Sequence, residues 1–192
     1  MSRRRQAGYT LVELMMALSL FIAGMVALVG MQKLQVRANS DARSLAVAQR
    51  IAETWAGQLQ MASLAWVDDP TFAPWLGTVG GGWTRPVPVA GRVGAAFDGV
   101  GNPLPDTALA QARYCTNIRL TYLYPNDFPV AGNGLMRAEI RVFWLRDGES
   151  TLDAAAGLCP TAPTAADLIL VGKSSERYEF VYHTTGIRQH PG

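Results

Sequence analysis

Hydrophobic residues are distributed along the chain in three ways, and each predicts a different element. The first is a run from Leu14 to Met31 that contains no charged side chain and has Ser19 as its sole hydroxyl. At about 1.5 Å per residue, a helix of this run would span about 27 Å, close to the hydrocarbon thickness of a bilayer. Because Arg3, Arg4 and Arg5 precede the run, we expect the N-terminus to be cytoplasmic and the remainder of the chain to lie outside.

The second pattern follows this run and is typical of one face of an amphipathic helix. Apolar residues recur at alternating steps of three and four, with charged residues between them, and no proline occurs between Tyr9 and Asp69. We therefore expect one helix of about 55–60 residues, roughly 85 Å long, ending at Asp68-Asp69-Pro70. Trp55 and Trp66 are interpreted as core anchors. The stripe consists of Leu45, Ala48, Ala52, Trp55, Leu59, Ala62 and Trp66.

The third pattern is strict alternation, which predicts β-strands. Residues that share a face are Tyr114, Ile118, Leu120, Tyr122 and Tyr124 in one segment, Met136, Ala138, Ile140, Val142 and Trp144 in the next, and Tyr178, Phe180 and Tyr182 in the last. The tyrosine-rich face is interpreted as core rather than as a binding platform. A further short strand is predicted at Leu168–Val171, and a glycine- and proline-rich loop at 77–105. The expected fold is α+β, with the helix stripe packed on one face of a small antiparallel sheet.

Composition narrows the function classes. The 192 residues are 49% apolar and 17% charged, which argues against a disordered chain. A net charge of +2, two cysteines and two histidines favour neither a polyanion binder nor a metal centre. Gly172-Lys173-Ser174 ends like a phosphate-binding loop, but Asp167 stands where the first glycine is required. We expect no enzyme activity, no catalytic, cofactor or metal site, and neither a nucleic acid nor a small-molecule substrate as partner.

The junction between the basic leader and the apolar run carries a specific motif. It reads Gly8-Tyr9-Thr10-Leu11-Val12-Glu13, and it resembles the class III signal of type IV prepilins. The resemblance implies cleavage between Gly8 and Tyr9 by a prepilin peptidase and N-methylation of Tyr9. Tyr9 departs from the phenylalanine that is most frequent there in the family, but an aromatic ring remains.

Glu13 is the fifth residue after the implied cleavage point. In the family, this glutamate of an incoming subunit pairs with the N-terminal amine of a neighbour. Such a pair attracts strongly at low dielectric, although desolvation offsets much of the gain. Our hypothesis is that Glu13 sets the registry of the assembled fibre, because only one stagger leaves no buried charge unpaired.

The resemblance extends to a subtype. The helix segment 23–32 and the segment Arg137–Trp144 are similar to those of PilV-type minor pilins. This implies a structural subunit that primes or caps a type IV pilus as part of a tip complex, and so supports pilus biogenesis, twitching motility or adhesion. The implied partners are other minor and major pilins, the prepilin peptidase and the inner membrane. The protein would be a single-pass inner-membrane protein with a periplasmic C-terminal domain, later incorporated in a pilus at the cell surface.

The expected domain organisation follows the same resemblance. Residues 1–8 form the leader, 9–31 the transmembrane and assembly half of the helix, 32–69 its amphipathic half, and 70–192 the globular head. The resemblance also implies a disulfide loop at 115–159. Cys115 lies on the outward phase of its strand and Cys159 in a later loop. An oxidising periplasm favours their disulfide, whereas a cytosolic location would leave two thiols.

Three alternatives remain open on the sequence alone. A minor pseudopilin of a type II secretion system would have the same anchor and the same assembly physics. A single-pass, membrane-anchored periplasmic binding protein would keep its leader and have a ligand site of its own. A secretory signal cleaved near Ala38 would release a soluble domain, but the apolar run is longer than the usual core of such a signal.

Overall fold

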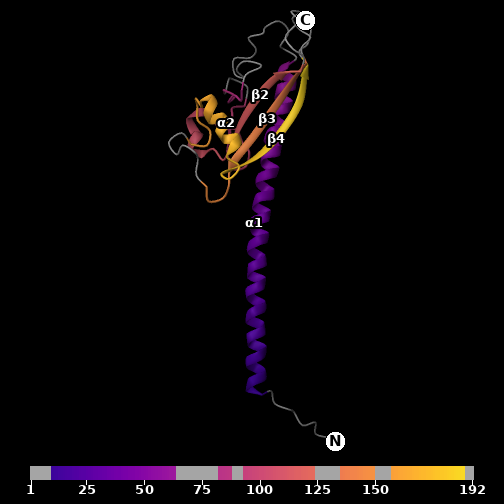
Figure 1. Cartoon of the computed structure of the whole chain (residues 1–192), viewed down its shortest axis with the longest axis vertical. Helices are drawn as coiled ribbons and strands as arrows, with labels where there is room; N and C mark the ends of the chain where they lie inside the picture. The colour runs from indigo at the N-terminus through magenta and orange to yellow at the C-terminus, as the bar shows by residue number, and fades with distance from the viewer. Residues whose placement is uncertain (1–9, 64–81, 88–92, 124–134, 150–156, 189–192) are drawn as a thin grey trace, which may run out of the picture. The chain divides into compact units, whose positions relative to one another are not determined.

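The computed structural model describes residues 10–63, 82–87, 93–123, 135–149 and 157–188. The chain divides into two compact units, 1–44 and 45–192, and the boundary falls within one helix. Elements follow in the order α1 (Leu11–Ser63), β1 (Ala96–Phe97), the 3-10 helix η1 (Asp106–Gln111), β2 (Tyr114–Tyr122), β3 (Leu135–Leu145), α2 (Ala165–Lys173) and β4 (Tyr178–Arg188). Figure 1 identifies the main elements.

The sheet is antiparallel throughout, with strand order β1-β2-β3-β4. The expected α+β fold is therefore confirmed, and each long strand lies where the alternation placed it. In the register, Ile118 lies opposite Ile140, which in turn lies opposite His183. Tyr124 and the predicted helix end at Asp68-Asp69-Pro70 lie outside the described residues.

The second unit has its main core between the Leu45–Ser63 part of α1 and one face of the sheet. Trp55 and Leu59 are fully buried there, as the apolar stripe predicted, whereas Leu45 is half exposed and Trp66 lies outside the described residues. The sheet contributes the predicted inward set of β3 and most of that of β2. Its buried members are Phe97, Tyr114, Ile118, Leu120, Met136, Ala138, Ile140, Val142, Trp144 and Ile187.

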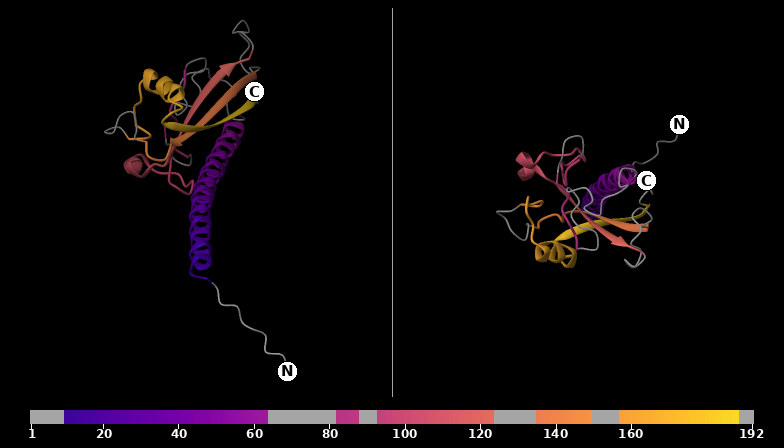
Figure 2. Two further views of the ribbon diagram at one scale, coloured as in Figure 1. Left: turned by 60° about the horizontal axis from the view of Figure 1, so that its bottom comes forward. Right: turned by 90° about the horizontal axis from the view of Figure 1, so that it is seen from above.

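A second core lies on the opposite face of the sheet, where α2 packs (Figure 2). Phe143 meets Tyr178 edge-on, with ring centroids 5.7 Å apart, and Phe180 extends the aromatic cluster. The aromatic residues of β4 therefore belong to this second core and not to the one against α1. Tyr182 ends the series on the surface, 56% exposed, so the core interpretation is wrong for that residue.

The predicted short strand at Leu168–Val171 is wrong, because these residues form the middle of α2. Thr164 caps the helix: its hydroxyl accepts a hydrogen bond from the Asp167 N–H, and the Asp167 carboxylate accepts one from the Thr164 N–H. This reciprocal capping box satisfies two backbone donors at the helix start. A run of four apolar residues has too little periodicity to separate strand from helix, and here the cap decides.

Candidate functional site

The N-terminal end of α1 is held by contacts within its first turn. The Thr10 hydroxyl accepts a hydrogen bond from the Glu13 N–H at 3.4 Å, and the Thr10 carbonyl accepts from the N–H groups of Glu13 and Leu14 at 3.1 and 3.2 Å. Thr10 and Glu13 have the spacing of a capping box. A carboxylate in the first turn also interacts favourably with the positive end of the helix dipole. The chain thus places Glu13 at the start of a well-formed helix.

The Glu13 carboxylate has no cation near it within the part of the chain that the structure describes, and it accepts no hydrogen bond there. Exposed Val12, Leu14 and Met16 surround it in the sequence. A carboxylate at the centre of a bilayer costs roughly 2.5–3.5 kcal/mol on insertion scales, and less near the interface. A cation from elsewhere would remove this cost. Gly8 and Tyr9, the predicted cleavage site, lie outside the described residues.

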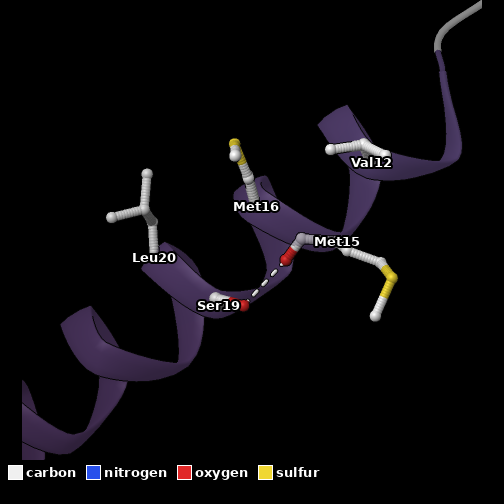
Figure 3. A pocket seen from close by; sticks show the side chains of 5 residues that line it. All are labelled: Val12, Met15, Met16, Ser19 and Leu20. Atoms are coloured by element: carbon white, nitrogen blue, oxygen red, sulfur yellow. Dashed lines mark hydrogen bonds between the residues drawn. The ribbon is translucent and has the colours of Figure 1, made fainter.

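The apolar half of α1 is exposed on every side in this chain. Figure 3 shows a groove lined by Val12, Met15, Met16, Ser19 and Leu20. The Ser19 hydroxyl donates to the Met15 carbonyl at 2.8 Å, so the groove presents no unsatisfied hydroxyl donor to a ligand. By length and composition α1 could cross a membrane. An apolar surface of this extent is normally covered by lipid or by protein.

The disulfide that the resemblance implied is present: Cys115 and Cys159 are bonded, with their Cα atoms 5.4 Å apart. Both are buried in the second core, and Cys115 lies on the outward phase of β2, as predicted. The bond ties β2 to the segment that leads into α2. With a sequence separation of 44, the chain-entropy model assigns it roughly 4 kcal/mol.

Arg141 is a buried cation that sequence reasoning missed. Arg141 falls between the predicted inward residues Ile140 and Val142, so the alternation puts it on the opposite, outer face of β3, yet it is only 1% exposed. Its Nη2 donates to the Asn117 side-chain oxygen at 2.8 Å and to the Leu168 carbonyl at 2.7 Å, and its guanidinium lies over the Trp83 ring, 4.5 Å from the centroid. Burial lowers the pKa of Arg141, and the neighbouring Tyr182 hydroxyl opposes that shift.

Gly172 explains how α2 approaches this guanidinium so closely. A Cβ atom at Gly172 would lie 2.5 Å from the Arg141 Nη1, a distance that real side chains do not adopt. The glycine of the false phosphate-binding motif thus has a packing role. It is also the one signal in the sequence that could have indicated a close approach at α2. Arg141 fastens α2 to the sheet, and its contacts are those of a structural residue.

No group of three or more His, Cys, Asp or Glu side chains within the described ranges could hold a metal ion. The features that point to a function are therefore the exposed apolar helix, the uncompensated Glu13 and the disulfide-bonded head. Sequence reasoning identified all three, because each leaves a local signature: a composition, a motif or a cysteine pair.

Comparison with known proteins adds one positive finding. Residues 3–29 match the family model described as the prokaryotic N-terminal methylation motif. No curated protein and no solved structure matches the chain. The matched motif supports a type IV pilin or pseudopilin, and with it processing by a prepilin peptidase and assembly with other pilins. It also indicates a membrane-anchored structural subunit.

Proposed function

We propose that this chain is a minor pilin of a type IV pilus, of the PilV type, that helps to prime or cap the fibre. The observation that carries the proposal is the coincidence of the matched motif with a helix that exposes its whole apolar surface and an uncompensated Glu13. A subunit of a fibre needs such a surface, since lipid covers it before assembly and neighbouring helices cover it afterwards.

The proposed processing generates the missing cation. Hydrolysis of the Gly8–Tyr9 peptide bond removes residues 1–8 and leaves the amine of Tyr9 as the new N-terminus, which is then methylated. That amine remains cationic at neutral pH. In the assembled fibre it would pair with Glu13 of an adjacent subunit, and removing either charge would leave the other buried and unpaired.

The proposed domain organisation assigns one task to each part of the chain. Residues 9–31 span the inner membrane and later pack in the fibre, and 32–69 link them to the head formed by 70–192. The head, with its Cys115–Cys159 bond, would lie in the periplasm and then at the cell surface, where it contacts other minor and major pilins. Its contribution to pilus biogenesis, motility or adhesion would come from these contacts.

A mass measurement tests the proposal. The full chain is expressed with and without a prepilin peptidase and extracted from the membrane, and its intact mass is measured by mass spectrometry. We expect the loss of residues 1–8 and the gain of one methyl group only when the peptidase is present. Gly8→Leu should block both changes, whereas Gly24→Ala, a glycine change within α1, should block neither. An uncut chain would overturn the proposal and favour the anchored binding protein, and cleavage near Ala38 would favour a soluble domain.

The minor pseudopilin is the second candidate, because the matched motif serves both classes. Co-purification separates them. A minor pilin should be recovered with the subunits of sheared pili, and a pseudopilin with the components of a secretion system. Recovery with the secretion components alone would replace the pilus assignment but would leave the processing chemistry unchanged.

A further inference from the structure

The two edges of the sheet differ in whether their backbone groups are paired. The outer edge of β2 is covered: Thr84 and Ile118 exchange backbone hydrogen bonds of 2.8 Å in both directions, and the Thr116 N–H donates to the Ala95 carbonyl. β4 forms the other edge and pairs with β3 alone among the strands that the structure describes. Among the described residues, one edge is therefore covered, whereas the other, the free edge, pairs with no further strand.

The hydrogen-bonding pattern identifies the groups on the free edge. Opposed residues of antiparallel strands alternate between bonded and non-bonded pairs. Because Ile118 bonds Thr84, the backbone N–H and C=O groups of even-numbered β2 residues point away from β3. The registers of β2 with β3 and of β3 with β4 then require the backbone groups of odd-numbered β4 residues to point toward β3. The Arg146 N–H, which donates to the Arg177 carbonyl at 2.9 Å, agrees with this phase. The residues whose backbone N–H and C=O groups point outward are Phe180, Tyr182, Thr184 and Gly186.

β4 lacks the features that most often protect an exposed edge. The strand Tyr178–Arg188 contains neither proline nor lysine, the two residues that most often guard an exposed edge. Its pairing with β3 runs without a bulge over the whole strand. No backbone or side-chain hydrogen bond occupies the outward groups of Tyr182, Thr184 or Gly186 within the described ranges. An edge of this length and regularity accepts a further strand.

Charge indicates what kind of strand fits. Gly186 lies opposite Arg137 in the register, and because glycine has no side chain, the Arg137 side chain, 45% exposed, lies next to the free edge. Glu139 is the carboxylate nearest to it, 3.6 Å away, and it also pairs with Arg119. Arg141 on the same face has no carboxylate partner. This face therefore carries an excess of positive charge.

We propose that the free edge of β4 receives an extended, acidic segment of a neighbouring subunit, which adds a strand to the sheet and places a carboxylate beside Arg137. The identity of the partner as a fibre subunit rests on the proposed function. A second copy of β4 is a poor match, because its one acidic residue, Glu179, lies on the α1 face and pairs with Arg146. The added strand would bond the outward groups of Tyr182, Thr184 and Gly186.

The test uses the full chain in detergent micelles and a synthetic peptide of about seven residues, alternating threonine and valine with a central aspartate. Amide hydrogen exchange is followed by mass spectrometry with electron-transfer fragmentation. We expect the peptide to slow exchange at Tyr182, Thr184 and Gly186. A peptide with lysine at the centre should bind roughly two- to fivefold more weakly, and one interrupted by proline should not bind.

Matched variants separate the backbone from the charge. Thr184→Pro removes one outward N–H and should abolish the protection, whereas Thr184→Val keeps the N–H and should retain it. Should Thr184→Pro fail to fold, Arg137→Glu still tests the proposal, because it should reverse the preference between the two peptides. Arg113→Glu, the same charge change at an exposed residue just before β2, should leave the preference as it was.

Three results would overturn the proposal. The first is no protection at millimolar aspartate peptide. The second is slow exchange of these amides in the free chain at every concentration, since the chain would then cover its own edge. The third is protection that rises with protein concentration without peptide, which would identify a second copy as the occupant. None of these depends on the leader, so a failure of Gly8–Tyr9 cleavage would remove the fibre subunit as partner but leave the peptide result in place.

Discussion

The segments Leu11–Ser44 and Leu45–Ser63 belong to the same helix, yet they meet opposite surroundings in this chain. Leu20 and Val36 in the first are 75% and 71% exposed, whereas Trp55 and Leu59 in the second are fully buried. The second segment has a stripe with charges between its members, and this stripe finds its partner in the sheet. The first is apolar on all sides over its 14–31 run, and that run has no such partner among the described residues. An amphipathic helix can bury its apolar stripe within its own fold, whereas a helix that is apolar all round needs lipid or another protein to cover it.

The largest expected effect is that of exchanging Glu13 for leucine, which should impair the function of the first segment and leave the second unchanged. The Glu13→Leu chain should insert in the membrane and fold its head, because the change lies far in sequence from the buried stripe, but its incorporation into pili should be lost. The measurement is the ratio of the protein in sheared pili to that in membranes. Glu53→Leu, the same exchange at an exposed position of the second segment, should incorporate normally. Normal incorporation of Glu13→Leu would refute the registry hypothesis.

Truncating an anchor in each segment compares their roles in stability. Trp55→Ala should lower the free energy of unfolding of the head by about 3–5 kcal/mol, because it leaves a large cavity between α1 and the sheet. Phe21→Ala, an exposed aromatic in the first segment, should change it by no more than about 0.5 kcal/mol. Guanidinium denaturation of both variants in detergent provides the measurement. Equal losses would show that the first segment also packs on the head.

Removing the disulfide should affect one unit alone. The double variant Cys115→Ala with Cys159→Ala should lose about 2–4 kcal/mol of head stability, seen as a lower melting temperature. Its extraction from membranes should not change, because the bond lies within the second unit. A reducing agent should lower the melting temperature of the parent chain but not that of the variant. A variant that no longer stays in the membrane fraction would contradict this separation.

The smallest expected effect concerns two helical glycines. A Cβ atom at Gly57 or at Gly24 would meet no atom within 4 Å among the described residues. Gly57→Ala should stabilise the head by up to about 1 kcal/mol, because alanine favours the helix. Gly24→Ala should leave the unfolding midpoint of the head where it was, since that turn does not take part in the core. Denaturation curves of the two variants and the parent would reveal a coupling between the segments if both midpoints moved.

Local patterns predicted much of this fold. The stripe of α1 and the alternation in β2 and β3 are set by periodicity, which can be read without knowing the partner. The burial of Arg141 could not be predicted, because it depends on Leu168 and Gly172, which follow it far along the chain. The helix at 165–173 was missed for a different and local reason, since its cap at Thr164 outweighs a short apolar run. For the candidate site, the motif identified Glu13, but its cation belongs to no described residue of this chain.

The hydrogen bond between the Ser19 hydroxyl and the Met15 carbonyl has a consequence for reversibility. Inside the apolar run, the backbone of the helix and its one hydroxyl donor satisfy each other locally, so no polar contact has to be exchanged when the surrounding medium changes from lipid to protein. Such a helix can leave a bilayer and return to it with its internal bonding intact. Side-chain packing and the charge at Glu13 then decide whether the helix is more stable in lipid or among protein helices. Repeated transfer between the two would break no hydrogen bond inside the apolar run.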